Sequence, residues 1–264
     1  MADLSYLVTW RDDGTAARLA NLAAVLAWVR SLPDVEPVVV EQDDAPRAGP
    51  ALRDGVRWVF CRNPGPFNKS WGLNVGARMT SAPLLAFGDA DVICARTWSR
   101  TVDRLRERAA IAKPYSHLID LTEEESVPVR AGQWNFQPQR AAGAPPNREG
   151  QGEFVVYAGG LFLLRREVFE QVGGFDERFL GWGGEDDAMT MRLMATGRPL
   201  VIQEGAPALH LWHPRSPATT FQQPHYAANC ALLADYRRGG AALCARLADL
   251  QRPTLGVTPP ANSA

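Results

Sequence analysis

The fold class is decided by residues 4–41, LSYLVTWRDDGTAARLANLAAVLAWVRSLPDVEPVVVE. Two short runs of apolar and β-forming residues, 4–10 and 35–41, enclose a segment in which apolar side chains recur at helical spacing over 16–30. The runs are typical of strands and the enclosed segment of a helix, with Thr15 as its cap and Pro33 beyond its end. A strand–helix–strand order with almost continuously apolar strands predicts a parallel sheet covered by helices on both faces.

The same alternation continues along the chain, which predicts an α/β protein with a central, mostly parallel sheet flanked by helices. Strands are predicted over 56–60, 84–87, 154–157, 161–164, 201–202 and 208–211, and helices over 68–79, 166–172, 185–196 and 226–236. We expect one domain over residues 1–252, with halves 1–114 and 115–252, and a mobile tail over 253–264, which is poor in apolar residues. Residues 115–152 are polar and contain several prolines and glycines, which predicts a long mobile loop.

The composition excludes several classes of protein. The chain of 264 residues has 28 basic and 29 acidic side chains, a formal net charge of −1, which argues against a nucleic-acid partner or a polybasic membrane anchor. No stretch approaches about 18 continuous apolar residues, so no transmembrane segment is expected, and the N-terminal sequence predicts no secretory signal. The four cysteines form no CxxC pair, which argues against a disulfide framework or a thiolate zinc site. We therefore expect a soluble, cytoplasmic protein.

The first candidate site residues form the triplet Asp89-Ala90-Asp91, directly after the strand predicted over 84–87. Ligands of parallel α/β folds gather at the carboxyl ends of the strands, where two carboxylates can hold a divalent cation that bridges a diphosphate. Such a triplet occurs roughly once by chance in a chain of this composition. The alternative is a strand-to-loop turn with solvated aspartates.

A pair of histidines, His210 and His213, stands at the end of the strand predicted over 208–211. The chain has only 4 histidines, so this spacing is rarer by chance than the aspartate triplet. Two imidazoles at a strand end could complete an Mn²⁺ site with Asp91, because imidazole and carboxylate ligands together suit such a metal. The alternatives are a surface-loop pair, or histidines bonded to backbone carbonyls.

The strongest indication of function is the segment 181–187, Gly-Trp-Gly-Gly-Glu-Asp-Asp. Acids at the start of a helix offset its dipole by about 0.3–1 kcal/mol each, which explains one or two acids but not the tryptophan beside them. A site for a sugar hydroxyl needs an aromatic ring that packs on the sugar and carboxylates that orient hydroxyl groups and remove a proton. The alternative is that Trp182 is an ordinary core residue.

Residues 67–77, FNKSWGLNVGA, are a further candidate segment. Their pattern predicts a capped helix with a basic residue in its first turn. A functional role would bring Asn68, Lys69 or Asn74 near a phosphate or a ribose.

Together these segments resemble those of metal-dependent A-type (GT-A) glycosyltransferases of the family 2 kind. The matching segments, in order and spacing, are 67–77, 89–91, 158–160 with 173–175, 181–187 and 210–213. The chain is most similar to the β-1,4-galactosyltransferases and next to the C-terminal segment of the polypeptide N-acetylgalactosaminyltransferases. The resemblance implies the GT-A fold, a Rossmann-like fold of nucleotide-diphospho-sugar transferases, with 1–114 binding the nucleotide sugar and 115–252 the acceptor.

The resemblance also implies roles for single residues. Asp91 and His213 match metal ligands, and His210 is a third candidate ligand at a position where the galactosyltransferases often have methionine; the ion would be Mn²⁺ or Mg²⁺. Asp186 matches the catalytic base. The implied acceptor contacts are Trp182, Gly183, Gly184, Glu185 and Asp187, and the implied donor contacts are Thr9, Arg11, Asn68, Lys69, Asn74 and Asp89. The tripeptide Thr9-Trp10-Arg11 departs from the proline-led version of the galactosyltransferases.

The implied activity is transfer of a sugar from a nucleotide-diphosphate sugar, expected to be UDP-linked, to a hydroxyl of a glycan or small-molecule acceptor, with inversion. A retaining enzyme of the same fold is an alternative, since the second resemblance is to retaining enzymes. Two rivals are a catalytically silent module that binds glycan or nucleotide sugar, and a metal-dependent hydrolase of nucleotide diphosphates. Because the chain lacks the anchor and disulfides of the animal Golgi members, a bacterial-type cytoplasmic enzyme of polysaccharide biosynthesis is expected.

Overall fold

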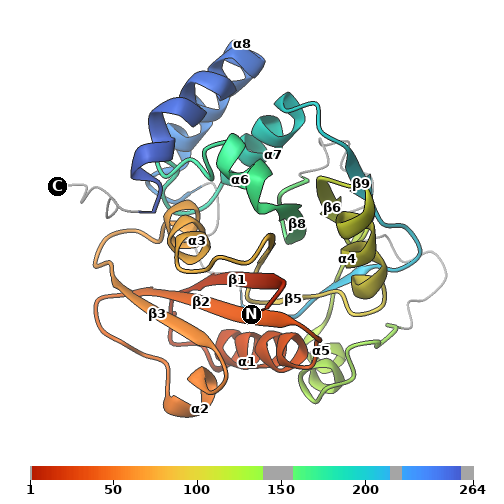
Figure 1. Ribbon diagram of the computed structural model, residues 1–264. Coiled ribbons are helices and arrows are strands. Elements are labelled where there is room, and N and C mark those ends of the chain that lie inside the picture. Colours follow the sequence, from red (N-terminus) through yellow and green to blue (C-terminus); the bar gives the residue numbers. More distant parts are fainter. Residues whose placement is uncertain (1, 139–156, 215–221, 257–264) are drawn as a thin grey trace, which may run out of the picture.

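The computed structural model describes residues 2–138, 157–214 and 222–256 (Figure 1). Its centre is a sheet of seven strands in the order β3–β2–β1–β4–β8–β6–β9. Neighbouring strands are parallel, except that β8 runs antiparallel to β4 and to β6. The strands are β1 (Leu4–Trp10), β2 (Val35–Asp43), β3 (Arg57–Arg62), β4 (Leu84–Gly88), β6 (Ile111–Lys113), β8 (Leu161–Arg165) and β9 (Leu200–Ile202). The predicted α/β fold with a central, mostly parallel sheet is confirmed.

Helices cover both faces of this sheet. In Figure 1, α1 lies below β1 and β2, and α3 lies above them. The described helices are α1 (Ala16–Arg30), α2 (Pro50–Arg53), α3 (Lys69–Arg78), α4 (Trp98–Glu107), α5 (Glu123–Arg130), α6 (Arg166–Gln171), α7 (Glu185–Ala195) and α8 (Tyr226–Gln251).

The alternation of side chains along β1 produces the two layers of the core. Tyr6 packs against Trp28 of α1, with ring centroids 5.8 Å apart, and belongs to the cluster on that face. Its neighbour Leu7 points the other way, into the cluster that includes Leu73 of α3 and Phe87 of β4. Almost continuously apolar strands are therefore needed here, because both faces are buried.

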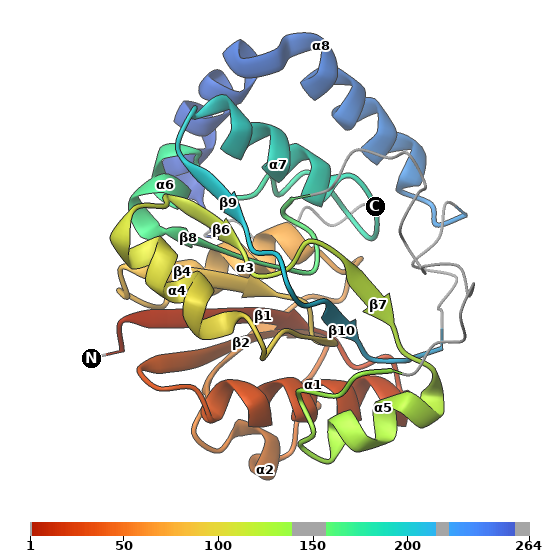
Figure 2. The ribbon, with the colours of Figure 1, turned by 90° about the vertical axis from the view of Figure 1, so that its right-hand side faces the viewer.

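A second, small sheet has the order β5–β10–β7. It consists of β5 (Val92–Ile93), β10 (Ala208–His210) and β7 (Leu118–Asp120). Strand β10 is antiparallel to β5 and parallel to β7. Figure 2 shows β7 and β10 side by side, with α5 next to α1 below them. The sequence did not predict β5 or β7, because strands of 2 and 3 residues are too short to carry a pattern.

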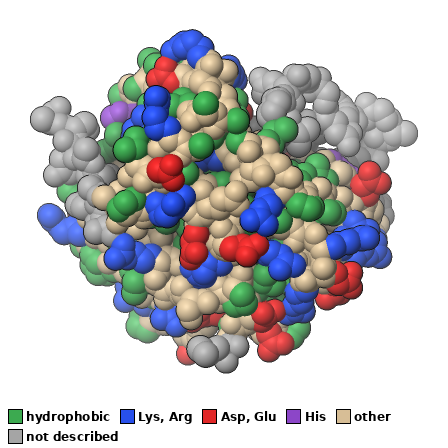
Figure 3. Space-filling view, turned by 45° about the horizontal axis from the view of Figure 1, so that its top comes forward, with side chains coloured by type: hydrophobic (Ala, Val, Ile, Leu, Met, Phe, Trp, Pro, Cys, Tyr) green, Lys and Arg blue, Asp and Glu red, His purple; other side chains and the backbone are tan. Residues whose placement is uncertain are grey.

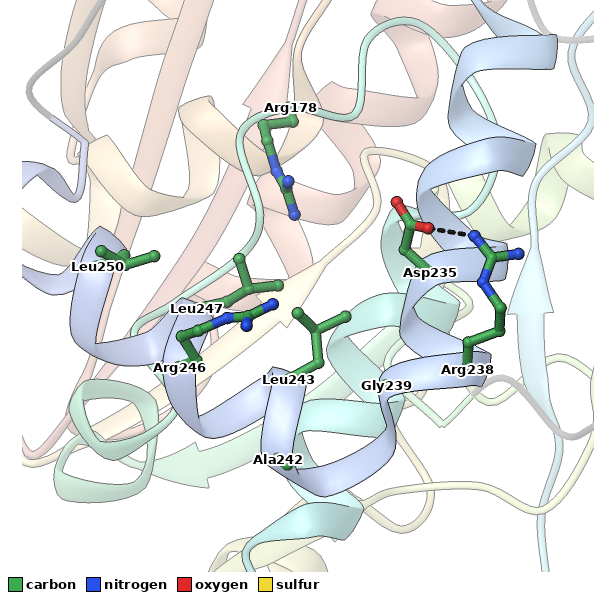
Figure 4. A pocket seen from close by; sticks show the side chains of 9 residues that line it. All are labelled: Arg178, Asp235, Arg238, Gly239, Ala242, Leu243, Arg246, Leu247 and Leu250. Atoms are coloured by element: carbon green, nitrogen blue, oxygen red, sulfur yellow. Dashed lines mark hydrogen bonds and ion pairs between the residues drawn. The ribbon is translucent and has the colours of Figure 1, made fainter.

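The predicted strands and helices within the described residues are confirmed to within two residues of their ends, with one exception. Helix α8 continues far beyond its predicted end, to Gln251, and bends at Gly240, whose backbone is not helical (φ 52°, ψ −147°). An open pocket of about 620 Å³ lies at this bend and is lined by residues of α8 and by Arg178 (Figure 4). The strand predicted over 154–157 lies outside the described residues, apart from Tyr157.

Residues 115–138 differ from the long loop that their polar composition predicted. Strand β7 and helix α5 lie within them, and Tyr115, Leu121 and Val129 are buried in the core. Residues 139–152 lie outside the described residues. Of the expected tail, residues up to 254 form a short 3-10 helix and Leu255 packs against the core, whereas 257–264 also lie outside the described residues.

Charged side chains of both signs are interspersed on the face seen in Figure 3, in keeping with the balanced composition. Within the described ranges, none of the helices has both the length and the apolar character needed to span a membrane.

Candidate active site

The candidate site lies at the edge of the central sheet where β1 to β4 end. Because β8 is antiparallel to β4, its first residue, Leu161, pairs with Gly88, so the turn before β8 lies at the same edge. The backbone N–H of Asp89 donates to the carbonyl oxygen of Gly160 at 2.8 Å. Gly160 has a φ of 73°, and a Cβ there would lie 2.2 Å from the hydroxyl of Tyr115. Only glycine therefore allows this turn to reach Asp89.

A cluster suited to a metal ion lies where β4 leads into the small sheet. Asp91, His210 and His213 each offer one ligand atom, and these atoms lie within 4.8 Å of one another. Asp91 Oδ1 is 3.6 Å from His210 Nε2, and Asp91 Oδ2 is 3.3 Å from His213 Nε2. Two imidazoles and one carboxylate suit borderline divalent cations such as Mn²⁺. The residues that the sequence predicted as ligands are thus brought together, and their chemistry fits a divalent cation.

The other ring nitrogen of each histidine points away from Asp91. Nδ1 of His210 is 2.8 Å from Asp120 Oδ1, and Nδ1 of His213 is 3.0 Å from the carbonyl oxygen of Pro214. Burial alone would raise the pKa of Asp91, but the charge of His210 and a hydrogen bond from His213 lower that pKa to about 2. Asp91 is therefore an anion at neutral pH.

A second cluster surrounds Lys69, in the first turn of α3. The Nζ of Lys69 lies 2.8 Å from Asp89 Oδ1, 3.0 and 3.1 Å from the two carboxylate oxygens of Asp186, and 4.0 Å from Glu185 Oε1. The Lys69 side chain is only 16% exposed and that of Asp186 21%. One ammonium group thus joins the end of β4 to the start of α7.

Burial and neighbouring charges set the protonation of this Lys69 cluster. Burial raises the pKa of Asp186 to about 7, against the opposing charge of Lys69 and together with the repulsion of Glu185 and Asp89. Burial also raises the pKa of Glu185. The pKa of Lys69 would be lowered by burial alone, but the three carboxylates raise it well above its usual value. Lys69 therefore stays charged, and Asp186 can accept a proton near neutral pH.

The glycines of segment 181–184 shape the chain before α7. Gly183 and Gly184 have φ values of 106° and 94°, and a Cβ at Gly184 would lie 2.8 Å from the ring of Phe179. The turn leaves Trp182 44% exposed and stacked on Tyr226, with ring centroids 5.9 Å apart and an interplanar angle of 13°. Trp182 is therefore not a core residue. The half-buried Asp187 follows Asp186 on α7.

Three of the expected donor contacts are buried side chains that form hydrogen bonds within the protein. Asn68 and Asn74 donate to backbone carbonyls of the segment 175–177, at 2.7 and 2.9 Å, and Asn68 also caps α3. The hydroxyl of Thr9 accepts a hydrogen bond from Gln42 at 2.7 Å. The two asparagines tie α3 to the segment 175–177. A contact of any of these three residues with a donor stays a prediction.

Arg11 lies just beyond β1 and ties the end of β2 to the loop that follows β3. Its guanidinium donates to the carbonyl oxygens of Gln42, Asn63 and Gly65 at 2.6, 2.8 and 2.8 Å. These bonds use three of its five N–H donors. A direct contact of Arg11 with a nucleotide stays a prediction.

Sequence reasoning missed Lys113, Asp120 and Tyr226. Lys113, at the end of β6, donates to the carbonyl oxygens of Tyr157 and Gly159 at 2.9 and 2.7 Å, and burial lowers its pKa to about 7. The feature of the sequence that could have indicated Lys113 is its position directly after an apolar run. Asp120 stands in the segment expected to be a loop, and Tyr226 at the start of a predicted helix, so neither is marked by a motif.

A mostly parallel sheet with a carboxylate–histidine cluster and an acidic cluster at its carboxyl edge is the arrangement expected of an A-type glycosyltransferase. Comparison with known families agrees. The chain belongs to glycosyl transferase family 2, because the profile of that family matches residues 17–173, more than half of the chain. The profile described as the N-terminal domain of galactosyltransferase matches residues 147–206.

Relatives with established names share part of the chain. Polypeptide N-acetylgalactosaminyltransferase 6 of Bos taurus is 28% identical over 162 residues, which cover 55% of this chain and 26% of that protein. Validoxylamine A glucosyltransferase of Streptomyces hygroscopicus subsp. jinggangensis is 30% identical over 184 residues, which cover 61% of this chain and 43% of that protein. The chain thus spans less than half the length of either relative.

Two solved structures of Drosophila β-1,4-galactosyltransferase 7 also match. Its catalytic domain in complex with xylobiose has 18% sequence identity and a TM-score of 0.43, over 77% of this chain and 65% of that one. A mutant in complex with manganese, UDP-Gal and xylobiose has 17% identity and a TM-score of 0.44 over the same shares.

Proposed function

We propose that this protein is a metal-dependent glycosyltransferase that moves a sugar, with inversion, from a nucleotide-diphosphate sugar to a hydroxyl group of a glycan or small molecule. A UDP-linked donor is the first choice, as the family resemblance implies. The observation that carries the proposal is the Lys69 ammonium, which lies 2.8 Å from Asp89 and 3.0 Å from Asp186. The ammonium joins Asp89, on the side where the donor would bind, to Asp186, on the side where the acceptor would bind. Family membership and the names of the two relatives support the reaction class.

On the donor side, Asp91, His210 and His213 would hold Mn²⁺ or Mg²⁺. A divalent cation bound there supplies Lewis-acid chemistry, because it neutralises the charge that develops on the leaving diphosphate. Metal binding requires deprotonated ligands, so Asp91 would bind as a carboxylate and the two imidazoles as neutral groups. The Lys69 ammonium provides a second positive charge for the diphosphate.

On the acceptor side, Asp186 is the general base. A carboxylate oxygen of Asp186 takes the proton of the acceptor hydroxyl while the hydroxyl oxygen attacks the anomeric carbon of the donor sugar. The bond from that carbon to the diphosphate oxygen breaks, and its electron pair leaves with the nucleotide diphosphate. A diphosphate in contact with Lys69 would draw the ammonium away from Asp186, and burial then keeps the carboxylate basic.

The segment before α7 forms the rest of the acceptor side. Trp182 and Tyr226 offer an aromatic surface on which the C–H face of a sugar can pack. Glu185 Oε2 accepts a hydrogen bond from the backbone N–H of Gly183 at 3.1 Å, which fixes the turn that presents Trp182. Asp187, the half-buried residue that follows Asp186 on α7, would orient acceptor hydroxyl groups.

The substitution Asp186→Asn tests the base, because it preserves shape and removes basicity. With a panel of nucleotide sugars, acceptors and Mn²⁺, we expect kcat to fall roughly 10²–10⁴-fold, while donor and Mn²⁺ affinities measured by calorimetry stay unchanged. Glu185→Gln is the matched control, since it removes the neighbouring carboxylate of the same helical turn. NMR of the product gives the anomeric configuration.

Each contrary outcome identifies a different error. More than about a tenth of the wild-type rate in Asp186→Asn would remove Asp186 from the role of base, and a larger loss in Glu185→Gln would move the role there. Retention at the anomeric carbon would assign the retaining reaction. A rate of nucleotide release that does not depend on the acceptor would favour a hydrolase. If no nucleotide is released from any donor, a catalytically silent binding module is favoured.

A further inference from the structure

The small sheet brings a second carboxylate to the candidate metal cluster. In the register of β10, His210 lies opposite Asp120 of β7 on one side and opposite Val92 of β5 on the other. Asp91 immediately precedes Val92, and its carbonyl oxygen accepts a hydrogen bond from the backbone N–H of Leu211 at 2.8 Å. The two carboxylates therefore flank the His210 ring from the two neighbouring strands.

The His210 ring contacts these carboxylates through different nitrogen atoms. Nδ1 is 2.8 Å from Asp120 Oδ1, a hydrogen-bond distance, whereas Nε2 is 3.6 Å from Asp91 Oδ1. A carboxylate that accepts the Nδ1 hydrogen fixes the ring orientation and leaves the lone pair on Nε2. In this tautomer the lone pair of His210 points to the same place as Asp91 and His213.

The two candidate ligand histidines are oriented in different ways. Nδ1 of His213 is 3.0 Å from the carbonyl oxygen of Pro214, its own neighbour in the chain. His210 instead depends on a side chain from another strand, 90 residues away in the sequence. A change at Asp120 should therefore disturb His210 and leave His213 in place.

We propose that Asp120 is a positioning residue of the metal site, which holds His210 so that Nε2 binds the divalent cation. This inference rests on the metal site of the proposed function. It adds a residue that no motif of the chain marks and that touches neither the donor nor the acceptor in the proposed reaction. Asp120 acts only through the imidazole that it orients.

The experiment compares Asp120→Ala and Asp120→Asn with the wild type, with Glu123→Ala as the control for loss of a nearby negative charge. Mn²⁺ affinity is measured by calorimetry, and the protonation of each histidine nitrogen by ¹⁵N NMR of the metal-free protein, at a pH high enough for the imidazoles to be neutral. We expect Asp120→Ala to weaken Mn²⁺ binding roughly 10–100-fold and His210 to lose its fixed Nδ1–H form. The amide oxygen of Asp120→Asn can still accept the Nδ1 hydrogen, so the tautomer and part of the affinity should be retained. Glu123→Ala should change neither.

The outcomes separate this inference from the metal site on which it rests. Wild-type Mn²⁺ affinity in Asp120→Ala, with His210 still in the Nδ1–H form, would overturn the positioning role alone. The absence of Mn²⁺ and Mg²⁺ binding in every protein, wild type included, would overturn the metal site and the inference with it. The NMR measurement on the wild type needs no variant to fold: His210 protonated on Nε2 and bare on Nδ1 would refute the inference directly.

Discussion

Replacing Lys69 with methionine should raise the pKa of Asp186 above its already elevated value. The Lys69 ammonium touches both carboxylate oxygens of Asp186, at 3.0 and 3.1 Å, and is the opposite charge that holds this pKa down. Burial and the repulsion of Glu185 and Asp89 act in the other direction and remain in the variant. Methionine fills a similar volume without the charge, so the electrostatic effect dominates.

The size of the change follows from the contact distance. An opposite charge within about 4–6 Å lowers a carboxyl pKa by about 1–3, and the Lys69 contact is at the short end of that range. From a starting pKa of about 7, the variant should titrate between about 8 and 10. At pH 7 the fraction of ionised Asp186 then falls from about half to about a tenth or less.

The assay is the pH dependence of kcat/KM, which reports the groups of the free enzyme. A general base works deprotonated, so the rate of the wild type should rise as pH increases through about 7. In Lys69→Met the same rise should occur at a pH about 1–3 higher. Lys69→Arg, which keeps the charge, should leave the midpoint near that of the wild type. The position of the midpoint is decisive, because a lost donor contact lowers the rate at every pH.

An unmoved midpoint in Lys69→Met would refute the reasoning, since it would mean that the acidic limb belongs to another group. A downward movement would refute it as well, because removal of the Lys69 ammonium takes away a charge that favours the ionised form of Asp186.

Two further predictions concern stability. Gly184→Ala should destabilise the fold more than Gly132→Ala in urea denaturation. Both residues have a left-handed backbone, φ 94° and 99°, which costs alanine about 1–2 kcal/mol, but only at Gly184 would the Cβ meet a side chain, at 2.8 Å, and this clash adds about 1–3 kcal/mol. Equal losses of stability in the two variants would contradict the clash with Phe179. Burial alone would raise the pKa of Asp176, yet the hydrogen bond and charges of its arginine partners lower it to about 2, so the folded state should lose about 2–3 kcal/mol as pH falls from about 5 to 1. In Asp176→Asn this acid-dependent part should vanish from thermal unfolding curves, and a variant that still loses it would show that another carboxyl group is responsible.

The central sheet could be predicted from the sequence because its strands and helices carry strong local patterns. The apolar run 84–87 and the helical spacing over 16–30 are local signals, and each became the expected element. The antiparallel direction of β8 could not be predicted, because it depends on which distant strand β8 pairs with. The small sheet was missed for another reason, since β5 has only 2 residues.

The candidate site was predictable where several unusual residues stand together. The motifs placed Asp91, His210 and His213 in one group, and the structure brings these three side chains together. Single polar residues near a motif were less informative. Asn68 and Thr9 are buried and form hydrogen bonds within the protein, and these bonds could not be predicted because their partners are distant in the sequence.

The balance of charge explains why such a site would depend on a metal ion. In the Lys69 cluster three carboxylates, those of Asp89, Glu185 and Asp186, face one ammonium group, so a nucleotide diphosphate would meet an excess of negative charge. The three candidate ligands carry only one formal negative charge among them, that of Asp91, because imidazole ligands bind as neutral groups and Asp120 contacts the ring of His210 on its other side. A divalent cation bound there keeps a net positive charge, which a set of three carboxylates would cancel. Histidine ligands beside an acidic acceptor side would thus let the cation attract the diphosphate while the carboxylates that handle the acceptor proton keep their charge.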